Sequence, residues 1–236
     1  MFFLPTMNRP ERLQEVLDAC VKTGMTAPGL VILNGVDQCM KYRHVKLPAN
    51  WQMTHLVKNK GFNGAMNWAW DQHSPDLEWY GCMADDAVPQ TEGWDQKIIA
   101  HLKDYAMVST NDGWQCNADP MVSRISPTSV FDAGMLKAMG FWFLPGLWSC
   151  YADDILEGLG RYFGFWKIDM DVMAEHKHVL NKKAPNDKTY DASYASKQSM
   201  ATDQAIYNSW LMGRSRVACM ERLAAYWTAR QQRKAA

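Results

Sequence analysis

Short apolar runs alternate with segments of helical periodicity along the first half of the chain, and this alternation restricts the folds that the chain can adopt. The runs begin at Phe2, Gly29, Trp51, Trp79 and Ala106, and turn-forming residues separate them from amphipathic stretches. Strands that alternate with helices at this spacing are typical of a parallel sheet with helices on both faces. We therefore predict an α/β fold with a mainly parallel central sheet.

The second half of the chain continues this pattern and then becomes helical. One helix is predicted over 132–139, closed by Gly140, and another begins near Ala152. A late strand is expected over 166–173, and the chain is expected to be helical from about residue 200. The economical division is one α/β domain over 1–195 with a helical C-terminal extension over 196–236.

Composition and charge indicate a folded protein without a global attraction to nucleic acid or to anionic membranes. The 236 residues are 47% hydrophobic and 21% charged, and 25 basic residues balance 25 acidic ones. The six cysteines are scattered without a C-x-x-C pair, which argues against a zinc ribbon and a compact disulfide framework. No secretory signal or membrane-spanning run is apparent, so a cytoplasmic location is expected, in the host cytoplasm if the protein is encoded by a phage.

Two adjacent carboxylates, Asp85 and Asp86, end the apolar run that starts at Trp79. They are therefore predicted to lie at the C-terminal edge of a strand, where ligands bind in open α/β sheets. Paired carboxylates at such an edge suit a hard divalent cation held against a phosphate. A solvated turn is the alternative interpretation.

A second acidic pair, Asp153 and Asp154, comes at the expected start of a helix. Acidic residues are favoured there by the helix dipole and as N-caps, and this alone would explain them. The functional interpretation is that one of them is a general base that deprotonates an attacking hydroxyl. The turn at Pro145 and Gly146 leads to Trp148, which offers either an aromatic surface for a sugar ring or base, or a core side chain.

His176 and His178 follow the late strand. Residues two apart in a strand point the same way, so both imidazoles are expected to face one site. One imidazole with carboxylates and phosphate oxygens suits Mn²⁺ or Mg²⁺, and an exposed strand end is the alternative. Lys60, after the third predicted strand, is a candidate for neutralising a diphosphate.

Several common nucleotide and hydrolase motifs are missing from the sequence. No G-x-G-x-x-G follows the first strand, and neither the P-loop pattern nor a G-x-S-x-G elbow occurs. The sequence therefore gives no support to dinucleotide oxidoreductases, P-loop enzymes or α/β-hydrolases.

Five groups of residues occur in a fixed order along most of the chain up to Tyr190. They are 3–6 with 8–12; 59–62 with Ala65 and Asn67; 84–86 with Pro89 and 93–95; 145–147 with 153–154; and His176, His178, 183–184, Asp187 and 189–190. Together they resemble the GT-A nucleotide-sugar glycosyltransferases, especially inverting family-2-like enzymes and small bacterial and phage proteins of this fold. There are two departures: Ala84 occupies the first position of the D-x-D metal motif, and Met7 replaces a basic residue of the first loop.

The resemblance implies a Rossmann-like GT-A sheet and assigns a role to each candidate residue. Asp86 with His176 or His178 would hold Mn²⁺ or Mg²⁺ on the diphosphate of a donor, with UDP-sugar preferred. The implied nucleotide contacts are Thr6, Arg9, Asp37, Lys60, Asn67, Asp85 and Lys183. Asp154 would be the base and Asp153 would orient the loop or the acceptor, beside Pro145, Gly146 and Trp148.

The expected function is therefore transfer of a sugar from a nucleotide-sugar to an acceptor hydroxyl, with inversion at the anomeric carbon. A glycan and a hydroxymethylated pyrimidine in phage DNA are both candidate acceptors, the latter because the basic segment from Arg214 to Lys234 would suit a DNA backbone. The alternatives are a sugar nucleotidyltransferase and a GT-A-fold nucleotide- or glycan-binding protein without catalysis. Ala84 is the feature that favours loss of catalysis.

Overall fold

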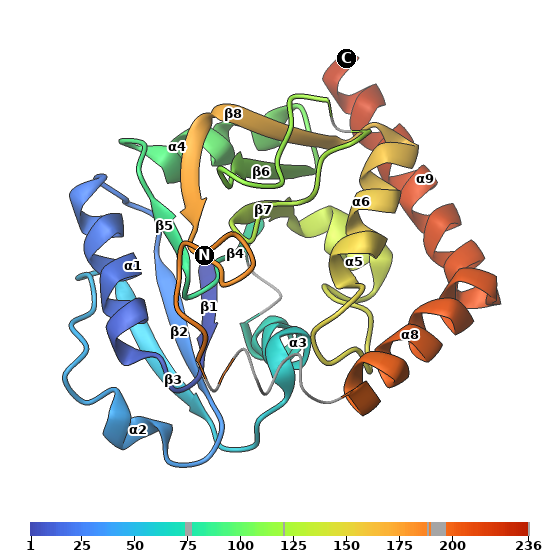
Figure 1. Ribbon diagram of the computed structural model, residues 1–236. Helices are drawn as coiled ribbons and strands as arrows, with labels where there is room; N and C mark the ends of the chain where they lie inside the picture. The colour runs from blue at the N-terminus through green and yellow to red at the C-terminus, as the bar shows by residue number, and fades with distance from the viewer. Residues whose placement is uncertain (74–76, 120, 188, 190–196, 236) are drawn as a thin grey trace.

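The protein is built on a central sheet with helices packed on both faces (Figure 1). The computed structural model describes residues 1–73, 77–119, 121–187, 189 and 197–235. The strands are β1 (Phe2–Thr6), β2 (Gly29–Asn34), β3 (Trp51–Leu56), β4 (Trp79–Cys82), β5 (Ala87–Pro89), β6 (Met107–Asn111), β7 (Ser129–Asp132) and β8 (Trp166–His176).

The sheet has the strand order β3-β2-β1-β4-β7-β6-β8-β5 and is mixed. Strands β3, β2, β1 and β4 pair in parallel, as the sequence predicts, and β8 pairs in parallel with β6. Strand β7 runs antiparallel to both β4 and β6, and β5 runs antiparallel to β8. The sequence pattern did not indicate the short strands β5 and β7, whose places are set by their pairing with β8, β4 and β6.

The helices form two groups, one on each face of the sheet. They are α1 (Pro10–Lys22), α2 (Gln38–Lys41), α3 (Gly61–His73), α4 (Trp94–Ala100), α5 (Ala133–Met139), α6 (Ala152–Phe163), α8 (Lys197–Met212) and α9 (Arg214–Ala235), with a 3₁₀ turn at His101–Lys103. Side chains of α1 and α4 share one core cluster with Phe2 and Leu4, and those of α3, α5 and α6 share the other with Phe3. Alternate residues of β1 therefore serve opposite cores, as the two-residue period of a strand requires.

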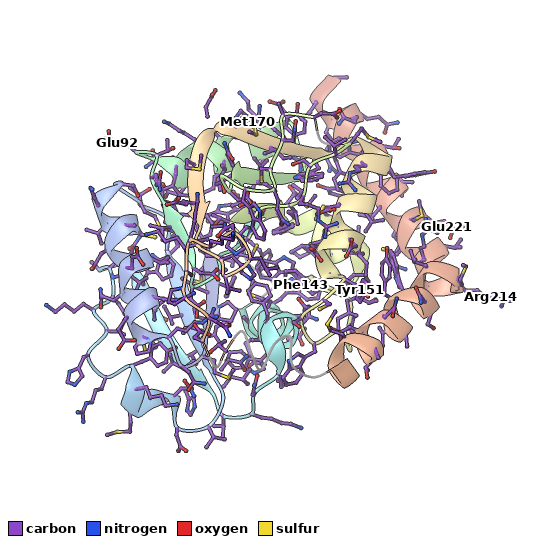
Figure 2. The ribbon with its side chains drawn as sticks, viewed as in Figure 1. Glu92, Phe143, Tyr151, Met170, Arg214 and Glu221 are labelled. Atoms are coloured by element: carbon purple, nitrogen blue, oxygen red, sulfur yellow. The ribbon has the colours of Figure 1, made fainter. Side chains whose placement is uncertain are left out.

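The two C-terminal helices cover the outer side of α5 and α6 (Figure 1). Figure 2 shows Arg214 and Glu221 on the outer surface of this pair. Phe143 is buried, and Tyr151 is partly buried against the same core. None of the helices among the described residues combines the length and apolarity needed to cross a membrane. The expected domain boundary at 195–196 falls outside the described residues.

Helix α9 is fixed to both ends of α5. Asp132 caps the N-terminus of α5 by accepting the Met135 N–H at 3.1 Å, and it also accepts hydrogen bonds from Tyr226 and Arg230 of α9. At the other end, the Arg222 guanidinium donates to the carbonyls of Ala138 and Met139. Both arginines therefore make internal bonds that hold α9 in place, and a contact of the basic segment with a DNA backbone stays a prediction.

Gly81→Ala tests the close packing of β4 on β1. A Cβ at this position would lie 2.3 Å from the ring of Phe2, which is fully buried. We expect a loss of about 1–3 kcal/mol in the free energy of unfolding, because the core has to shift to accommodate the added methyl group. The measurement is urea denaturation followed by circular dichroism.

Gly158→Ala is the matched control. This exposed position on α6 has no atom within 4 Å of the added Cβ. Here alanine is expected to stabilise by about 0.5–1 kcal/mol, because glycine loses more backbone entropy in a helix. Equal stability of the two variants would contradict the close approach of Phe2 to β4.

Candidate functional site

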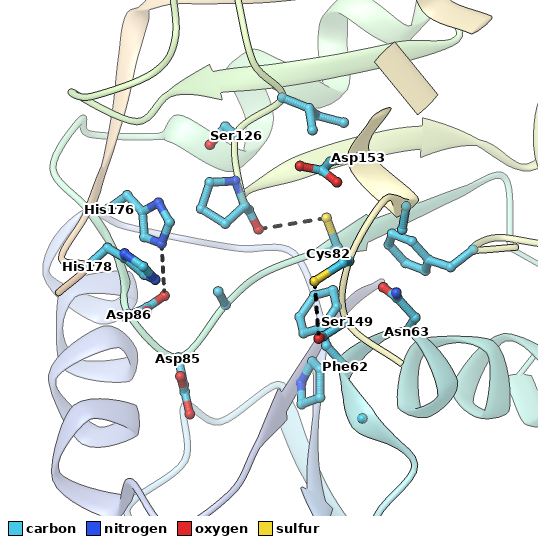
Figure 3. Close-up of a pocket in the computed structure, with 18 of the residues that line it drawn as sticks. Phe62, Asn63, Cys82, Asp85, Asp86, Ser126, Ser149, Asp153, His176 and His178 are labelled. Atoms are coloured by element: carbon cyan, nitrogen blue, oxygen red, sulfur yellow. Dashed lines mark hydrogen bonds and ion pairs between the residues drawn. The ribbon is translucent and has the colours of Figure 1, made fainter. Parts of the chain in front are cut away.

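One cavity of about 590 Å³ opens at the carboxyl ends of β1, β2 and β4. Its walls come from five parts of the chain: the strand ends, the start of α3, the loop over 114–127, the segment over 148–156 and the segment from His176 to Thr189. Figure 3 shows Asp85, Asp86, His176 and His178 on one side, and Phe62, Asn63, Ser149 and Asp153 toward the other. The cavity lies at the sheet edge where ligands bind in open α/β folds.

Asp85 is buried, and both of its carboxylate oxygens bind other parts of the protein. The Thr6 hydroxyl donates to Oδ2 at 2.7 Å, and Arg9 Nη1 donates to Oδ1 at 3.1 Å. The Thr6 hydroxyl in turn lies 2.7 Å from the Tyr42 hydroxyl. Burial raises the pKa of Asp85 to about 6, although the Arg9 charge opposes this. Asp85 therefore joins the end of β4 to the loop after β1.

Arg9 connects this acidic edge to the segment that follows the two histidines. Its Nε and Nη2 donate to the two carboxylate oxygens of Asp187 at 2.9 and 3.0 Å. Its Nη1 lies 3.7 Å from Asp86 Oδ2, in addition to its bond with Asp85. Thr189 donates to the Met7 carbonyl nearby. A two-pronged guanidinium–carboxylate pair of this kind fixes both partners in orientation.

Asp86 and His176 face each other at the end of β8. Asp86 Oδ1 lies 3.5 Å from His176 Nε2, and both side chains are largely buried. Two donors that each lie about 2.1 Å from one metal ion are roughly 3 to 3.5 Å apart, so this spacing fits a shared cation. A carboxylate with an imidazole is also a donor set that Mn²⁺ accepts.

His178 has a different role in this geometry. The Leu180 N–H donates to His178 Nδ1 at 3.2 Å, and burial, followed by the neighbouring His176, lowers the pKa of His178. His178 Nδ1 is therefore engaged by a backbone N–H, whereas Nε2 of His176 faces Asp86. Of the two histidines, His176 is the one that fits a cation.

The protein supplies only part of a coordination shell here. Within the parts of the chain that the structure describes, no three His, Cys, Asp or Glu side chains come together as a complete ligand set. Mg²⁺ in proteins is often held by one or two carboxylates plus substrate phosphates. The pair of Asp86 and His176 fits a cation that a bound phosphate would complete.

Trp114 covers the two histidines. Its ring stacks on His178, with centroids 5.5 Å apart and planes at 19°, and lies 5.7 Å from His176. Asp112 holds this loop, because its Oδ1 accepts the N–H groups of Trp114, Gln115 and Cys116 at 2.8 to 2.9 Å. No pattern in the sequence predicted that Trp114 would pack on the two histidines.

Arg124 binds the acidic pair at the start of α6. Its Nη2 donates to Asp153 at 2.6 Å and its Nη1 donates to Asp154 at 2.9 Å, while its Nε lies 3.3 Å from the buried Glu157. Burial alone would lower the pKa of Arg124, but the bond to Asp154 and the charges of Asp153 and Glu157 raise it. Sequence reasoning missed Arg124, which stands in a loop with no helical or strand period.

Asp153 and Asp154 differ in their relation to the cavity. Asp153 lines the wall and Asp154 does not, although both bind Arg124. Figure 3 shows the Asp153 carboxylate directed toward the cavity from α6. The residue that the sequence nominated as base, Asp154, is therefore the less accessible of the two from the cavity.

Trp148 lines the cavity and packs against the start of α3. A Cβ at Gly61 would lie 2.3 Å from the Trp148 carbonyl oxygen and 2.9 Å from its ring, so only glycine fits at this contact. The Asn63 N–H donates to the same carbonyl at 3.3 Å. Trp148 is 37% exposed, so it is a surface of the cavity and not a core residue.

The structure brings together eight of the predicted site residues as cavity wall, namely Thr6, Arg9, Asp85, Asp86, Trp148, Asp153, His176 and His178. The others lie outside this wall, namely Asp37, Lys60, Asn67, Pro145, Gly146, Asp154 and Lys183. Tyr190, part of the last motif, lies outside the described residues.

The predicted site residues outside the cavity wall are either exposed or bound to other parts of the protein. Asp37 and Lys60 are exposed. Asn67 exchanges two hydrogen bonds with the Phe143 backbone at 2.7 and 2.9 Å, and Lys183 Nζ donates to Glu175 at 2.7 Å. Asn67 therefore positions the loop before α6 from a distance, and the Lys183 ammonium is paired with a carboxylate.

The fold is that of known glycosyltransferase structures. Mannosyltransferase PcManGT from Pyrobaculum calidifontis, in complex with GDP-Man and Mn²⁺, matches with a TM-score of 0.56 at 13% identity, over 98% of this chain and 85% of that one. Glucosyl-3-phosphoglycerate synthase from Mycobacterium tuberculosis, in complex with Mn²⁺, UDP and glucosyl-3-phosphoglycerate, matches with a TM-score of 0.54 at 11% identity, over 88% of this chain and 79% of that one. The chain therefore has the GT-A fold, as the sequence predicted.

Sequence comparisons alone give no such likeness. A mycobacterial protein of solved structure also matches in fold, with a TM-score of 0.58 at 12% identity over 88% of this chain and 74% of that one. No protein-family model matches the chain, and no curated protein sequence matches it. The similarity to these structures is thus one of fold.

Asp85→Asn tests the buried carboxylate through the pH dependence of stability. Because the pKa of Asp85 is raised to about 6 in the folded protein, the folded state binds this proton more tightly than the unfolded chain, whose pKa is about 4. The stabilisation from this site is complete below about pH 4 and is lost as the pH rises through about 6.

The expected result is a difference in unfolding free energy between wild type and Asp85→Asn that falls across this pH window. Urea denaturation of both proteins at steps of pH measures it. A difference that stays constant, or that grows as the pH rises, would show that Asp85 is not held in a proton-favouring environment.

Proposed function

We propose that this protein is a metal-dependent glycosyltransferase that moves a sugar from a nucleotide-sugar donor to an acceptor hydroxyl. One observation carries the proposal: a cation-fitting pair, Asp86 and His176, and a helix-borne carboxylate, Asp153, line the same cavity at the carboxyl edge of a GT-A sheet. The solved structures of this fold named above include complexes with Mn²⁺ and a nucleotide or nucleotide-sugar, which supports the same assignment.

The side of the cavity with Asp86 and His176 is the proposed donor half. A divalent cation bound there would neutralise charge on the diphosphate leaving group. His178 lines the same region, and the Trp114 ring packs against both imidazoles. Arg9 and Thr6 also line this half. Both donate hydrogen bonds to Asp85, so they hold the loop after β1 in position beside the proposed nucleotide site.

The side with Asp153 is the proposed acceptor half. In a single displacement, the acceptor oxygen forms a bond to the anomeric carbon while the bond from that carbon to the diphosphate oxygen breaks. The proton of the hydroxyl passes to the Asp153 carboxylate, and the nucleoside diphosphate leaves. Attack from the side opposite the leaving group inverts the anomeric configuration.

This assignment revises the sequence-based choice of base. Asp154 holds Arg124 and so keeps the acidic pair oriented, whereas Asp153 meets the cavity. A retained anomeric configuration in the product would contradict the role of Asp153 as base in a single displacement.

A binding protein that has lost catalysis is the second candidate function. Ala84 occupies the first position of the D-x-D motif and lines the cavity, so one carboxylate typical of the motif is missing. The two functions differ in turnover: both predict nucleotide binding, and only the transferase consumes the donor.

Asp86→Ala is expected to abolish metal-dependent nucleotide binding. Isothermal calorimetry of UDP and of GDP, each with and without Mn²⁺, measures it. Asp71→Ala, which removes an exposed carboxylate of α3, is the control and should bind like wild type. Absence of binding of both nucleotides to the wild type, or equal metal-dependent binding to Asp86→Ala, would contradict the donor half.

Asp153→Asn is expected to lower turnover by about 10²–10⁴-fold, because the general base is lost, while nucleotide affinity is kept. Asp154→Asn is expected to have a smaller effect. The measurement is release of the nucleoside diphosphate from UDP-glucose and from GDP-mannose, with water as the default acceptor. A larger effect in Asp154→Asn than in Asp153→Asn would return the base to Asp154.

A further inference from the structure

We infer that the acceptor half of the cavity binds an uncharged glycoside, on a wall that Asp203 of the C-terminal helix α8 positions. This inference rests on the proposed function and deepens it, because it names the acceptor class and a positioning residue. Three features carry it: the aromatic surface of this half, the state of its charges, and the bonds of Asp203.

The first feature is the aromatic and apolar surface beside Asp153. Phe62 and Phe143 meet edge to face, with centroids 5.8 Å apart and planes at 76°, and both line the cavity. Trp148, Ile125 and Leu156 line it as well. A pyranose ring has one face of C–H groups, and flat aromatic side chains offer it a large contact area at low entropic cost.

The second feature is the charge of this half. Among the described residues that line the cavity, the cationic or titratable basic ones are Arg9, Arg124, His176 and His178. Arg124 is the one beside Asp153, and it is shared by Asp153, Asp154 and Glu157. Glu157 also pairs with Arg161 at 3.3 Å, so three carboxylates share two guanidinium groups here. An anionic acceptor such as a sugar phosphate would therefore meet a net negative field.

The third feature is the carboxylate of Asp203, which is only 1% exposed. Its Oδ1 accepts the Trp148 N–H at 2.8 Å, and its Oδ2 accepts the Ser149 and Cys150 N–H groups at 3.0 and 2.9 Å. All three donors belong to residues that line the cavity. Asp203 thus satisfies three backbone groups at once and fixes this wall relative to α8.

A second contact joins α8 to the same wall. The rings of Tyr151 and Tyr207 stack with centroids 5.0 Å apart and planes at 14°. Tyr151 has a left-handed backbone, with φ of 63°, and directly precedes α6. Helix α8 therefore contacts 148–150 and Tyr151, the segment that leads from Trp148 to Asp153.

The test compares neutral and phosphorylated sugars of the same ring. Saturation-transfer difference NMR, in the presence of UDP and Mg²⁺, measures binding of the methyl glycosides of glucose, mannose and galactose and of the corresponding 6-phosphates. We expect at least one neutral glycoside to bind, and to bind more tightly than its 6-phosphate.

Three variants assign the binding to this wall. Trp148→Ala should abolish the glycoside signal, because it removes the ring surface. Asp203→Asn should weaken glycoside binding about tenfold, because an amide oxygen cannot replace both carboxylate oxygens toward three buried donors, and should leave the affinity for UDP unchanged. Gln204→Asn, at an exposed neighbouring position on α8, is the control and should behave like wild type.

Each of the other outcomes contradicts one part of the inference or the proposed function on which it rests. Equal or tighter binding of a 6-phosphate, or no glycoside binding while UDP binds, overturns the acceptor class. Equal loss of UDP and glycoside affinity in Asp203→Asn shows a general structural role and overturns the positioning role. Failure of UDP and GDP to bind the wild type contradicts the proposed function itself and is thereby distinguished from failure of this inference.

Discussion

The buried ion pair between Arg9 and Asp85 is the interaction on which the acidic half of the cavity depends. It joins the loop after β1 to the end of β4, two neighbouring parallel strands, at 3.1 Å. Burying two charges is costly unless each is well paired, and here Thr6 and Asp187 supply the further bonds. Removal of Arg9 would leave the Asp85 charge buried without this cation, so the pair holds the end of β4, and with it Asp86, in position.

The opposite half depends on the C-terminal helices. Asp203 of α8 binds the backbone of 148–150, and Arg230 of α9 binds Asp132 at the start of α5. A segment that follows the α/β pattern in sequence therefore acts as part of the cavity support. Two of its arginines, Arg222 and Arg230, bind the chain at the two ends of α5.

Local signals were sufficient for the elements whose patterns are long or capped. The helix closed by Gly140 is present as α5, with Asp132 as its N-cap and Gly140 in a left-handed conformation. The acidic pair after the fourth apolar run stands at the end of β4 as predicted. The short strands β5 and β7 escaped detection, because their place is decided by pairing with β8, β4 and β6 and not by their own residues.

The sequence by itself determined the α/β class, the positions of the principal strands and helices, and the placement of Asp85 and Asp86 at a strand end, because these follow from local periodicity and turn chemistry. Only the tertiary structure decided which of these residues share a cavity. It separated Asp153 from Asp154, joined Asp86 to His176, and brought in Arg124 and Asp203. Such contacts span tens of residues along the chain and depend on side-chain direction, which a one-dimensional pattern does not contain.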